Sequence, residues 1–406
     1  MNSFVRILPV AAAVLLAVQP SLGDLLVGSY NGNQILRFNE TTGAFLGVFA
    51  SGGGLDGPTA MTFGPDGNLY VASFQNDRIL RYNGITGAFM GEFVTAGLGR
   101  LTRPVGMAFG RDGKLYVTST GWDEGLTGHV LRYEGTTGDF IDLFIGGRNG
   151  ASDLAFGPDG YLYVRHRHPL YEVRRYDANG WPLASVRVPD GEVIVFGLDS
   201  KFYLNVYYAS PDVLRCSADT MAPPEIFINA GSGGLGVAGG LLFGPDGKLY
   251  VSSGADNNVR RYDGITGAFI DVFIPSGSGG LNSPFKMLFT PPISVVIDIK
   301  PRSLPNSINL QSWGSIPVAI LSSASFHAPA QVDKASLKFG RTGNESSLAF
   351  CNASPEDVNS DARRDQVCHF YTQQTAFQAG DTVGVLTGKT VSGTPIRGTD
   401  SVRIVP

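Results

Sequence analysis

Short runs of alternating apolar and polar residues fill positions 25–290, and these runs recur with a regular period. Residues 63–89 read FGPDGNLYVASFQNDRILRYNGITGAF, and residues 243–269 read FGPDGKLYVSSGADNNVRRYDGITGAF. The Phe that begins this string recurs at intervals of 40 to 47 residues, at Phe63, Phe109, Phe156, Phe196, Phe243 and Phe289. A period of this length with several short strands per unit is typical of β-propeller blades and not of helical solenoids.

Each unit predicts four antiparallel strands. In the second unit these are residues 61–63, 69–73, 78–82 and 88–94, and the first turn is Gly64-Pro65-Asp66-Gly67, which suits a tight reversal. The third-strand motif occurs six times, as ILRF (35–38), ILRY (79–82), VLRY (130–133), VRRY (173–176), VLRC (213–216) and VRRY (259–262). The sequence therefore predicts an all-β domain, a six-bladed β-propeller over residues 24–290.

The two ends of this domain each supply part of one blade. Residues 25–29 align with a second strand that lacks its first strand, and residues 285–289 form a first strand without a successor. We expect 285–289 to pair with 25–29, because this closes the ring and removes its open edges.

The strings FGPDG(N/K)LYV and (I/V)(L/R)RY resemble those of NHL-repeat and gluconolactonase-like six-bladed propellers of secreted bacterial proteins. The resemblance covers residues 24–290 and implies the propeller fold. It does not imply an activity, because such propellers serve as enzymes, binding modules and scaffolds alike.

Residues repeated in every blade are predicted to be structural, so a functional site should lie where one blade departs from the pattern. The third-strand Arg and the turn Asp are such repeated residues. Four side chains depart from the pattern near the expected channel: Asp153, His166, His168 and Glu192. They could hold a divalent metal or act as acid and base, and the resemblance implies acidic, Asn or His ligands around the channel. Arg165 and Arg167 support the alternative, a solvated rim that repels cations.

The period ends at a linker, residues 291–293, and residues 294–406 contain short alternating strands that predict a β-sandwich. The strings IDIKPRSLPNSINL, IPVAILSS and DSVRIVP resemble an uncharacterised module appended to bacterial secreted proteins. This resemblance implies location and architecture and no particular chemistry.

Residues 357–365 of this second domain read DVNSDARRD, which follows the start of an EF-hand-type calcium loop. The expected ligands are Asp357, Asn359, Asp361, the backbone carbonyl of Arg363, and Asp365. The loop resembles the DxNxDGxxD loops of integrin-type repeats and dockerin-like modules. Ala362 stands where those loops have Gly, and Cys368 stands where an EF-hand has Glu, so a polar turn without metal is the alternative.

Cys351 and Cys368 bracket this loop, and in an exported protein they could form a disulfide. Cys216 replaces the Tyr or Phe of the other third strands, so we expect it to be buried and unreactive.

Residues 1–23 predict a secretory signal peptide, with Arg6 before an apolar run of about a dozen residues, which is too short to span a bilayer. No later segment approaches the required length, so we expect a secreted or periplasmic protein without an integral membrane segment. The net charge of −4 with no basic cluster argues against binding to nucleic acid.

Two functions remain open on the sequence. The first is a non-catalytic recognition or scaffold protein that binds a protein or glycan ligand and carries calcium in its second domain. The alternative is a metal-assisted, lactonase-like hydrolase or lyase with its site at the mouth of the channel.

Overall fold

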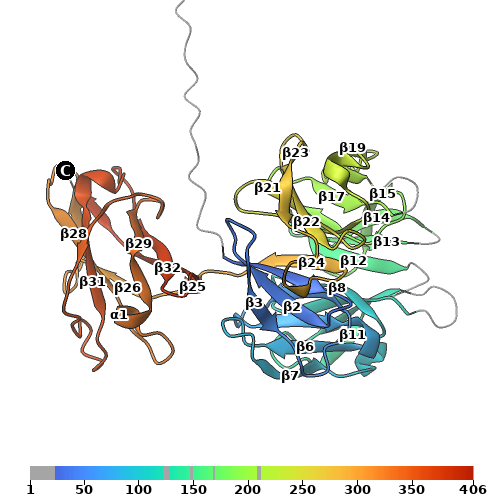
Figure 1. The fold of residues 1–406 in the computed structure, drawn as a ribbon, viewed down its shortest axis with the longest axis horizontal. Coiled ribbons are helices and arrows are strands. Elements are labelled where there is room, and N and C mark those ends of the chain that lie inside the picture. The colour runs from blue at the N-terminus through green and yellow to red at the C-terminus, as the bar shows by residue number, and fades with distance from the viewer. Residues whose placement is uncertain (1–22, 122–127, 147–149, 168–169, 208–211, 406) are drawn as a thin grey trace, which may run out of the picture. The chain divides into compact units, whose positions relative to one another are not determined.

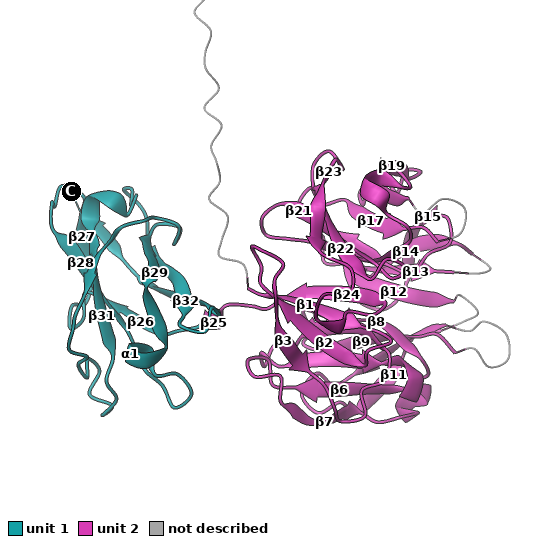
Figure 2. Ribbon diagram, viewed as in Figure 1, with its two compact units in different colours: residues 1–21, 294–406 teal, residues 22–293 magenta. Residues whose placement is uncertain are grey.

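The computed structural model describes residues 23–121, 128–146, 150–167, 170–207 and 212–405. It divides the chain into two compact units (Figure 2): residues 22–293, called the first unit below and drawn in magenta (unit 2 in the key), and residues 294–406, called the second unit below and drawn in teal (unit 1 in the key). The signal-peptide prediction falls almost entirely on residues 1–22, which lie outside the described residues. No helix in the described ranges is long and apolar enough to cross a membrane.

The first unit is a six-bladed β-propeller, and each blade is a four-stranded antiparallel sheet (Figure 1). Blade 1 has the order β24 (Pro284–Phe289), β1 (Leu25–Ser29), β2 (Gln34–Phe38), β3 (Phe45–Ala50). Blade 2 consists of β4 (Pro58–Phe63), β5 (Leu69–Ser73), β6 (Arg78–Tyr82) and β7 (Phe89–Val94), and blade 3 of β8 (Pro104–Phe109), β9 (Leu115–Ser119), β10 (His129–Tyr133) and β11 (Phe140–Ile145).

The remaining blades follow the same order. Blade 4 consists of β12 (Ala151–Phe156), β13 (Leu162–His166), β14 (Glu172–Tyr176) and β15 (Pro182–Arg187). Blade 5 consists of β16 (Ile194–Phe196), β17 (Phe202–Asn205), β18 (Val213–Cys216) and β19 (Glu225–Ile228). Blade 6 consists of β20 (Ala238–Phe243), β21 (Lys248–Ser253), β22 (Asn258–Asp263) and β23 (Phe269–Ile274).

The ring closes through strands from the two ends of the domain. β24 pairs antiparallel with β1, with Phe289 opposite Leu25 and Met287 opposite Val27. The first strands β24, β4, β8, β12, β16 and β20 contact one another in this cyclic order. They therefore surround the centre of the ring, and blade 1 lies opposite blade 4.

The repeated residues act as the sequence predicts, as architectural groups. The carboxylate of the turn Asp in each FGPDG-type string accepts a hydrogen bond from a Tyr hydroxyl four residues later, as between Asp66 and Tyr70 at 3.0 Å. That Tyr ring also contacts the Phe that begins the string in the following blade, as Tyr70 does with Phe109 at 5.1 Å between centroids. This contact joins blade 2 to 3, 3 to 4, 4 to 5, 5 to 6 and 6 to 1.

The second unit has two four-stranded sheets. One has the order β25 (Ile293–Ser294), β33 (Pro395–Ser401), β32 (Val383–Thr390), β29 (Val332–Gly340), and the other β26 (Ile297–Ile299), β28 (Ser315–Ile320), β31 (Gln366–Tyr371), β30 (Leu348–Cys351). A parallel pair, β27 (Ser307–Asn309) with β34 (Arg403–Val405), and a short helix α1 (Ala328–Gln331) complete the unit. Buried Phe339 and Phe370 pack between the sheets with ring centroids 5.1 Å apart, which is the core of a β-sandwich.

Candidate functional site

A cavity of about 140 Å³ opens at the end of the propeller where first strands begin and second strands finish. Its wall comes mainly from blades 3 and 4 and from the segment that leads into blade 5. The lining residues are Phe74, Val105, Thr120, Gly128, Gly150, Ala151, Ser152, Arg167, Tyr171, Asp190 and Glu192. The wall thus combines aromatic and glycine surface with three charged side chains.

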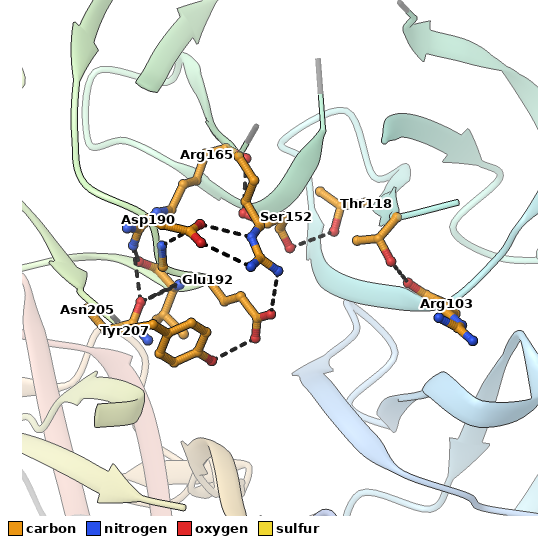
Figure 3. A network of polar contacts seen from close by, with 12 residues as sticks. Arg103, Thr118, Ser152, Arg165, Asp190, Glu192, Asn205 and Tyr207 are labelled. Carbon is orange, nitrogen blue, oxygen red and sulfur yellow. Dashed lines mark hydrogen bonds and ion pairs between the residues drawn. The ribbon is translucent and has the colours of Figure 1, made fainter. Parts of the chain in front are cut away.

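The charged side chains of this cavity are bonded to one another (Figure 3). Arg167 follows β13, and its Nε and Nη2 atoms lie 3.0 and 3.2 Å from the two carboxylate oxygens of Asp190. Its Nη1 atom donates to Oε1 of Glu192 at 3.0 Å, and the Tyr207 hydroxyl donates to Oε2 of Glu192 at 2.7 Å. Burial raises the pKa of Tyr207 well above its usual value, so this phenol stays protonated.

A second arginine fixes the segment that carries the two carboxylates. Arg165 is 1% exposed, and its guanidinium donates to the carbonyl oxygens of Val193 and Pro189, both at 2.9 Å, and to Oδ1 of Asn205 at 3.1 Å. The same Asn205 oxygen accepts the backbone N–H groups of Glu192 and Val193. Burial lowers the pKa of Arg165 to about 10, so it remains charged at neutral pH. Arg165 and Asn205 therefore hold residues 189–193 in place.

An ion pair spans the centre of the ring beside this site. Nζ of Lys286, on β24 of blade 1, lies 2.5 Å from Oδ2 of Asp153, on β12 of blade 4. The same Asp153 oxygen accepts the backbone N–H of Ile194 at 3.0 Å. At Gly106, a Cβ atom would lie 2.2 Å from the Asp153 carboxylate, so only glycine leaves room for this pair.

Among the described residues, the structure does not gather the predicted catalytic residues Asp153, His166 and Glu192 into one group. Asp153 pairs with Lys286, and Glu192 is held by Arg167 and Tyr207. The solvated rim expected around His166 is wrong for that residue, which is 1% exposed and has Nε2 2.9 Å from the Tyr176 hydroxyl. His168 lies outside the described residues. Of the three that the structure describes, only Glu192 lines the cavity.

Sequence reasoning missed several residues of this network: Asp190, Asn205 and Tyr207, with Arg165 and Arg167 judged only as cation-repelling. A signal was present. Arg165 and Asn205 occupy the position at which the other second strands carry Gly28, Ala72, Thr118 and Ser252. In the structure this position faces the first strand of the following blade, as Ser252 does when it donates to the Phe285 carbonyl at 2.7 Å.

The acidic loop of the second unit forms hydrogen bonds within itself. The Asp357 carboxylate accepts the N–H groups of Asp361 and Ala362, and Asn359 accepts that of Asp361. The Asp361 carboxylate accepts the N–H of Arg363 at 2.8 Å and its guanidinium at 3.1 Å.

The last acidic residue of the loop is turned toward the sheet. Asp365 is fully buried and accepts the N–H groups of Ser322 at 2.7 Å and Val358 at 3.0 Å. Across the described residues, no three His, Cys, Asp or Glu side chains lie together as a metal site would require. Calcium coordination by this loop stays a prediction. Cys351 and Cys368 form the predicted disulfide between β30 and β31, and Cys216 is buried and free.

Comparisons with known proteins support the fold alone. No family model matches the chain, and no curated protein matches it. Among solved structures, a protein of unknown function from Bacteroides caccae matches with a TM-score of 0.52 and 16% identity, over 66% of this chain and 99% of that one. A chain of a nidogen/laminin complex matches with a TM-score of 0.52 and 14% identity, over 66% and 98%. These neighbours are β-propeller proteins, and at such identities the similarity carries no statement about activity.

Proposed function

We propose that this protein is a non-catalytic, extracytoplasmic recognition protein whose propeller binds a ligand group in the cavity beside Arg167. The observation that carries the proposal is the pairing of the cavity's charges. Both carboxylates accept hydrogen bonds from Arg167, and Glu192 accepts a further bond from Tyr207. A general base needs a free lone pair directed at the substrate, whereas a recognition site gains from groups that are already fixed in position.

The size and wall of the cavity suit a single side chain or sugar ring of a larger ligand. Its volume is about 140 Å³, and the ring of Phe74 is covered on one side by the guanidinium of Arg103, 5.7 Å from the centroid. Aromatic surface with a few convergent polar groups is typical of small ligand sites. The predicted signal peptide and the Cys351–Cys368 disulfide support a location outside the cytoplasm.

The test is a screen of the mature chain against peptide and glycan arrays, with binding measured for Phe74→Ala beside the wild type. Trp181→Ala is the matched control, since Trp181 is an exposed aromatic residue of the same propeller outside the cavity. We expect Phe74→Ala to weaken binding and Trp181→Ala to leave it unchanged. Equal effects of the two variants would contradict the proposal.

The hydrolase or lyase alternative has its own test. The wild type and Glu192→Gln are incubated with a panel of lactones, esters and glycans in the presence of divalent metals. Turnover by the wild type that Glu192→Gln abolishes would overturn the non-catalytic proposal.

Calcium binding by residues 357–365 is a separate proposal, supported by the oxygen spacing and by backbone at Ser360 and Ala362 that already curves through positive φ. We expect calcium to raise the melting temperature of the full chain and Asp361→Ala to abolish the rise. An unchanged melting temperature on adding calcium would show that the loop is a polar turn.

A further inference from the structure

A groove of about 220 Å³ lies on the second unit, on the outer face of the sheet that contains β28 and β31. Alternate residues of β31 face opposite ways, so Cys368 and Phe370 are buried in the core while His369 and Tyr371 face outward. Pro317 of β28 is paired with His369 and also lines the groove. The floor is therefore a rigid, strand-based surface.

A flat aromatic platform borders this groove. The ring of Phe350, on β30, stacks on the imidazole of His369 with centroids 4.4 Å apart and an angle of 14° between the planes. One face of Phe350 covers His369, yet the residue is 55% exposed, and Tyr371 on the neighbouring strand is 47% exposed. Burial lowers the pKa of His369, so the stacked imidazole is neutral at pH 7.

The polar groups at the groove are planar and their charges cancel. Arg302, Asn352 and Glu356 all line it, and Asn352 Nδ2 lies 3.4 Å from Glu356 Oε1. Arg302 is exposed and forms no ion pair with any described residue. One guanidinium and one carboxylate give no net charge, and together with the amide they supply both donors and acceptors in a plane. Glu356 would repel an anionic ligand, and Arg302 would repel a cationic one.

We propose that this groove binds a neutral glycan, with one sugar ring resting on the open face of Phe350. A pyranose has a flat face of C–H groups and a rim of hydroxyls, which matches an aromatic face beside planar polar side chains. The apolar face of the sugar would cover the exposed ring, and neighbouring hydroxyls would pair with Asn352, two residues further along the chain, and with Glu356, to which Asn352 is hydrogen-bonded. This site is independent of the propeller cavity and extends the proposed function to a second ligand.

The experiment uses the full mature chain and isothermal titration calorimetry with soluble neutral polysaccharides, namely a β-glucan, a xylan and a galactomannan, beside the acidic polygalacturonate. We expect at least one neutral polymer to bind, and Phe350→Ala to weaken that binding by about tenfold or more. Phe350→Trp retains an aromatic face and should keep the affinity. Val383→Ala, a similarly exposed apolar site on the other sheet, is the control.

Each possible result of this titration either supports or overturns the proposal. Loss of binding in Phe350→Ala with an unchanged melting temperature, and retention in Phe350→Trp, supports the groove. Binding of polygalacturonate alone, binding of no polysaccharide, or equal affinity of wild type and Phe350→Ala would each overturn it. None of these results depends on the propeller cavity, whose test uses Phe74 variants.

Discussion

At the scale of single residues, the glycine-rich connectors are explained by aromatic rings of the outer strands. Between blades, Gly53, Gly99, Gly233 and Gly279 adopt positive φ, and a Cβ at any of them would lie 2.1 to 2.2 Å from a Phe ring carbon. The rings belong to Phe89, Phe140, Phe269 and Phe45, respectively. The sequence places each of these glycines between the fourth strand of one blade and the first strand of the next. It could not predict the ring contacts, which join residues about 36 to 41 positions apart or, for Gly279 and Phe45, opposite ends of the domain.

Gly279→Ala should therefore destabilise the propeller by more than its backbone strain. Both Gly277 and Gly279 have positive φ, which costs a non-glycine residue about 1–2 kcal/mol. Only at Gly279 would the methyl group also meet the Phe45 ring, since nothing lies within 4 Å at Gly277. Urea unfolding should give a larger loss for Gly279→Ala than for Gly277→Ala, and equal losses would show that the ring moves aside freely.

In the second unit, replacing Ala362 by glycine should have the opposite effect and stabilise the fold. The sequence suggested that Ala362 stands where a calcium loop has glycine, and its φ of 65° places it in the left-handed region. Ala362→Gly should raise the free energy of unfolding in calcium-free buffer by up to about 1 kcal/mol, because the strain exceeds the entropy that glycine adds to the unfolded chain. Ala335→Gly, in strand β29, should instead destabilise. A loss of stability in Ala362→Gly would show that the strain is relieved elsewhere.

At the scale of elements, the third-strand arginine ties the third strand to the fourth in blades 3, 5 and 6. In blade 6, Arg261 donates to both carboxylate oxygens of Asp271, at 2.9 and 2.6 Å, and its guanidinium lies 4.3 Å from the centroid of Phe273. Blade 3 repeats the arrangement with Arg132 and Asp142. Arg132, Arg215 and Arg261 thus have the structural role that the sequence predicts for the third-strand arginines.

This pairing should appear in the acid stability of the propeller. The hydrogen bonds from Arg261 lower the pKa of Asp271 below its usual 3.8. The folded state thus keeps the charge to lower pH than the unfolded chain, so the stabilisation is present above about pH 4 and is lost as the pH falls through the folded pKa. Because Asp271 is 42% exposed, the effect should not exceed about 1 kcal/mol.

Unfolding measured from pH 6 to pH 2 should show a shallower acid-side fall in Asp271→Asn than in the wild type. Asp219→Asn changes an exposed aspartate in the loop between β18 and β19 and serves as the control. If both variants follow the wild-type curve, the ion pair contributes nothing measurable.

In the candidate site, the strand pattern predicts which residues are unusual but not which partners their side chains contact. Asp153, His166 and Glu192 do depart from the repeat, and all three carry specific polar contacts. Their side chains nevertheless point to different partners. Consecutive residues of β13 face opposite sides of the sheet, so His166 points away from the side that Arg165 faces. The pairing of β12 with β13 also shifts register between Ala151 and Asp153. A register shift of this kind redirects side chains and leaves no mark in the hydrophobic pattern.

At the scale of the whole molecule, ring closure and the central ion pair are connected. Lys286 and Asp153 each lie three residues before the Phe that begins the repeated string, so they occupy the same position of their first strands, and in a ring of six the first and fourth blades are opposite. The sequence therefore predicts that the two residues lie on opposite sides of the ring, although it does not show whether their side chains are in contact. They do meet, through the closing strand β24.

Breaking this pair should test whether the closing strand is fixed by charge or by packing. Asp153 is 1% exposed, so Lys286→Met leaves a buried carboxylate without its cation, which typically costs about 3–5 kcal/mol. Lys286→Met with Asp153→Asn removes both charges and keeps an acceptor for the Ile194 N–H, so it should recover most of the lost stability. Urea unfolding of the wild type, both single variants and the double variant measures the coupling. If the double variant is as unstable as Lys286→Met, the pairing of the two charges is not what stabilises the closing strand.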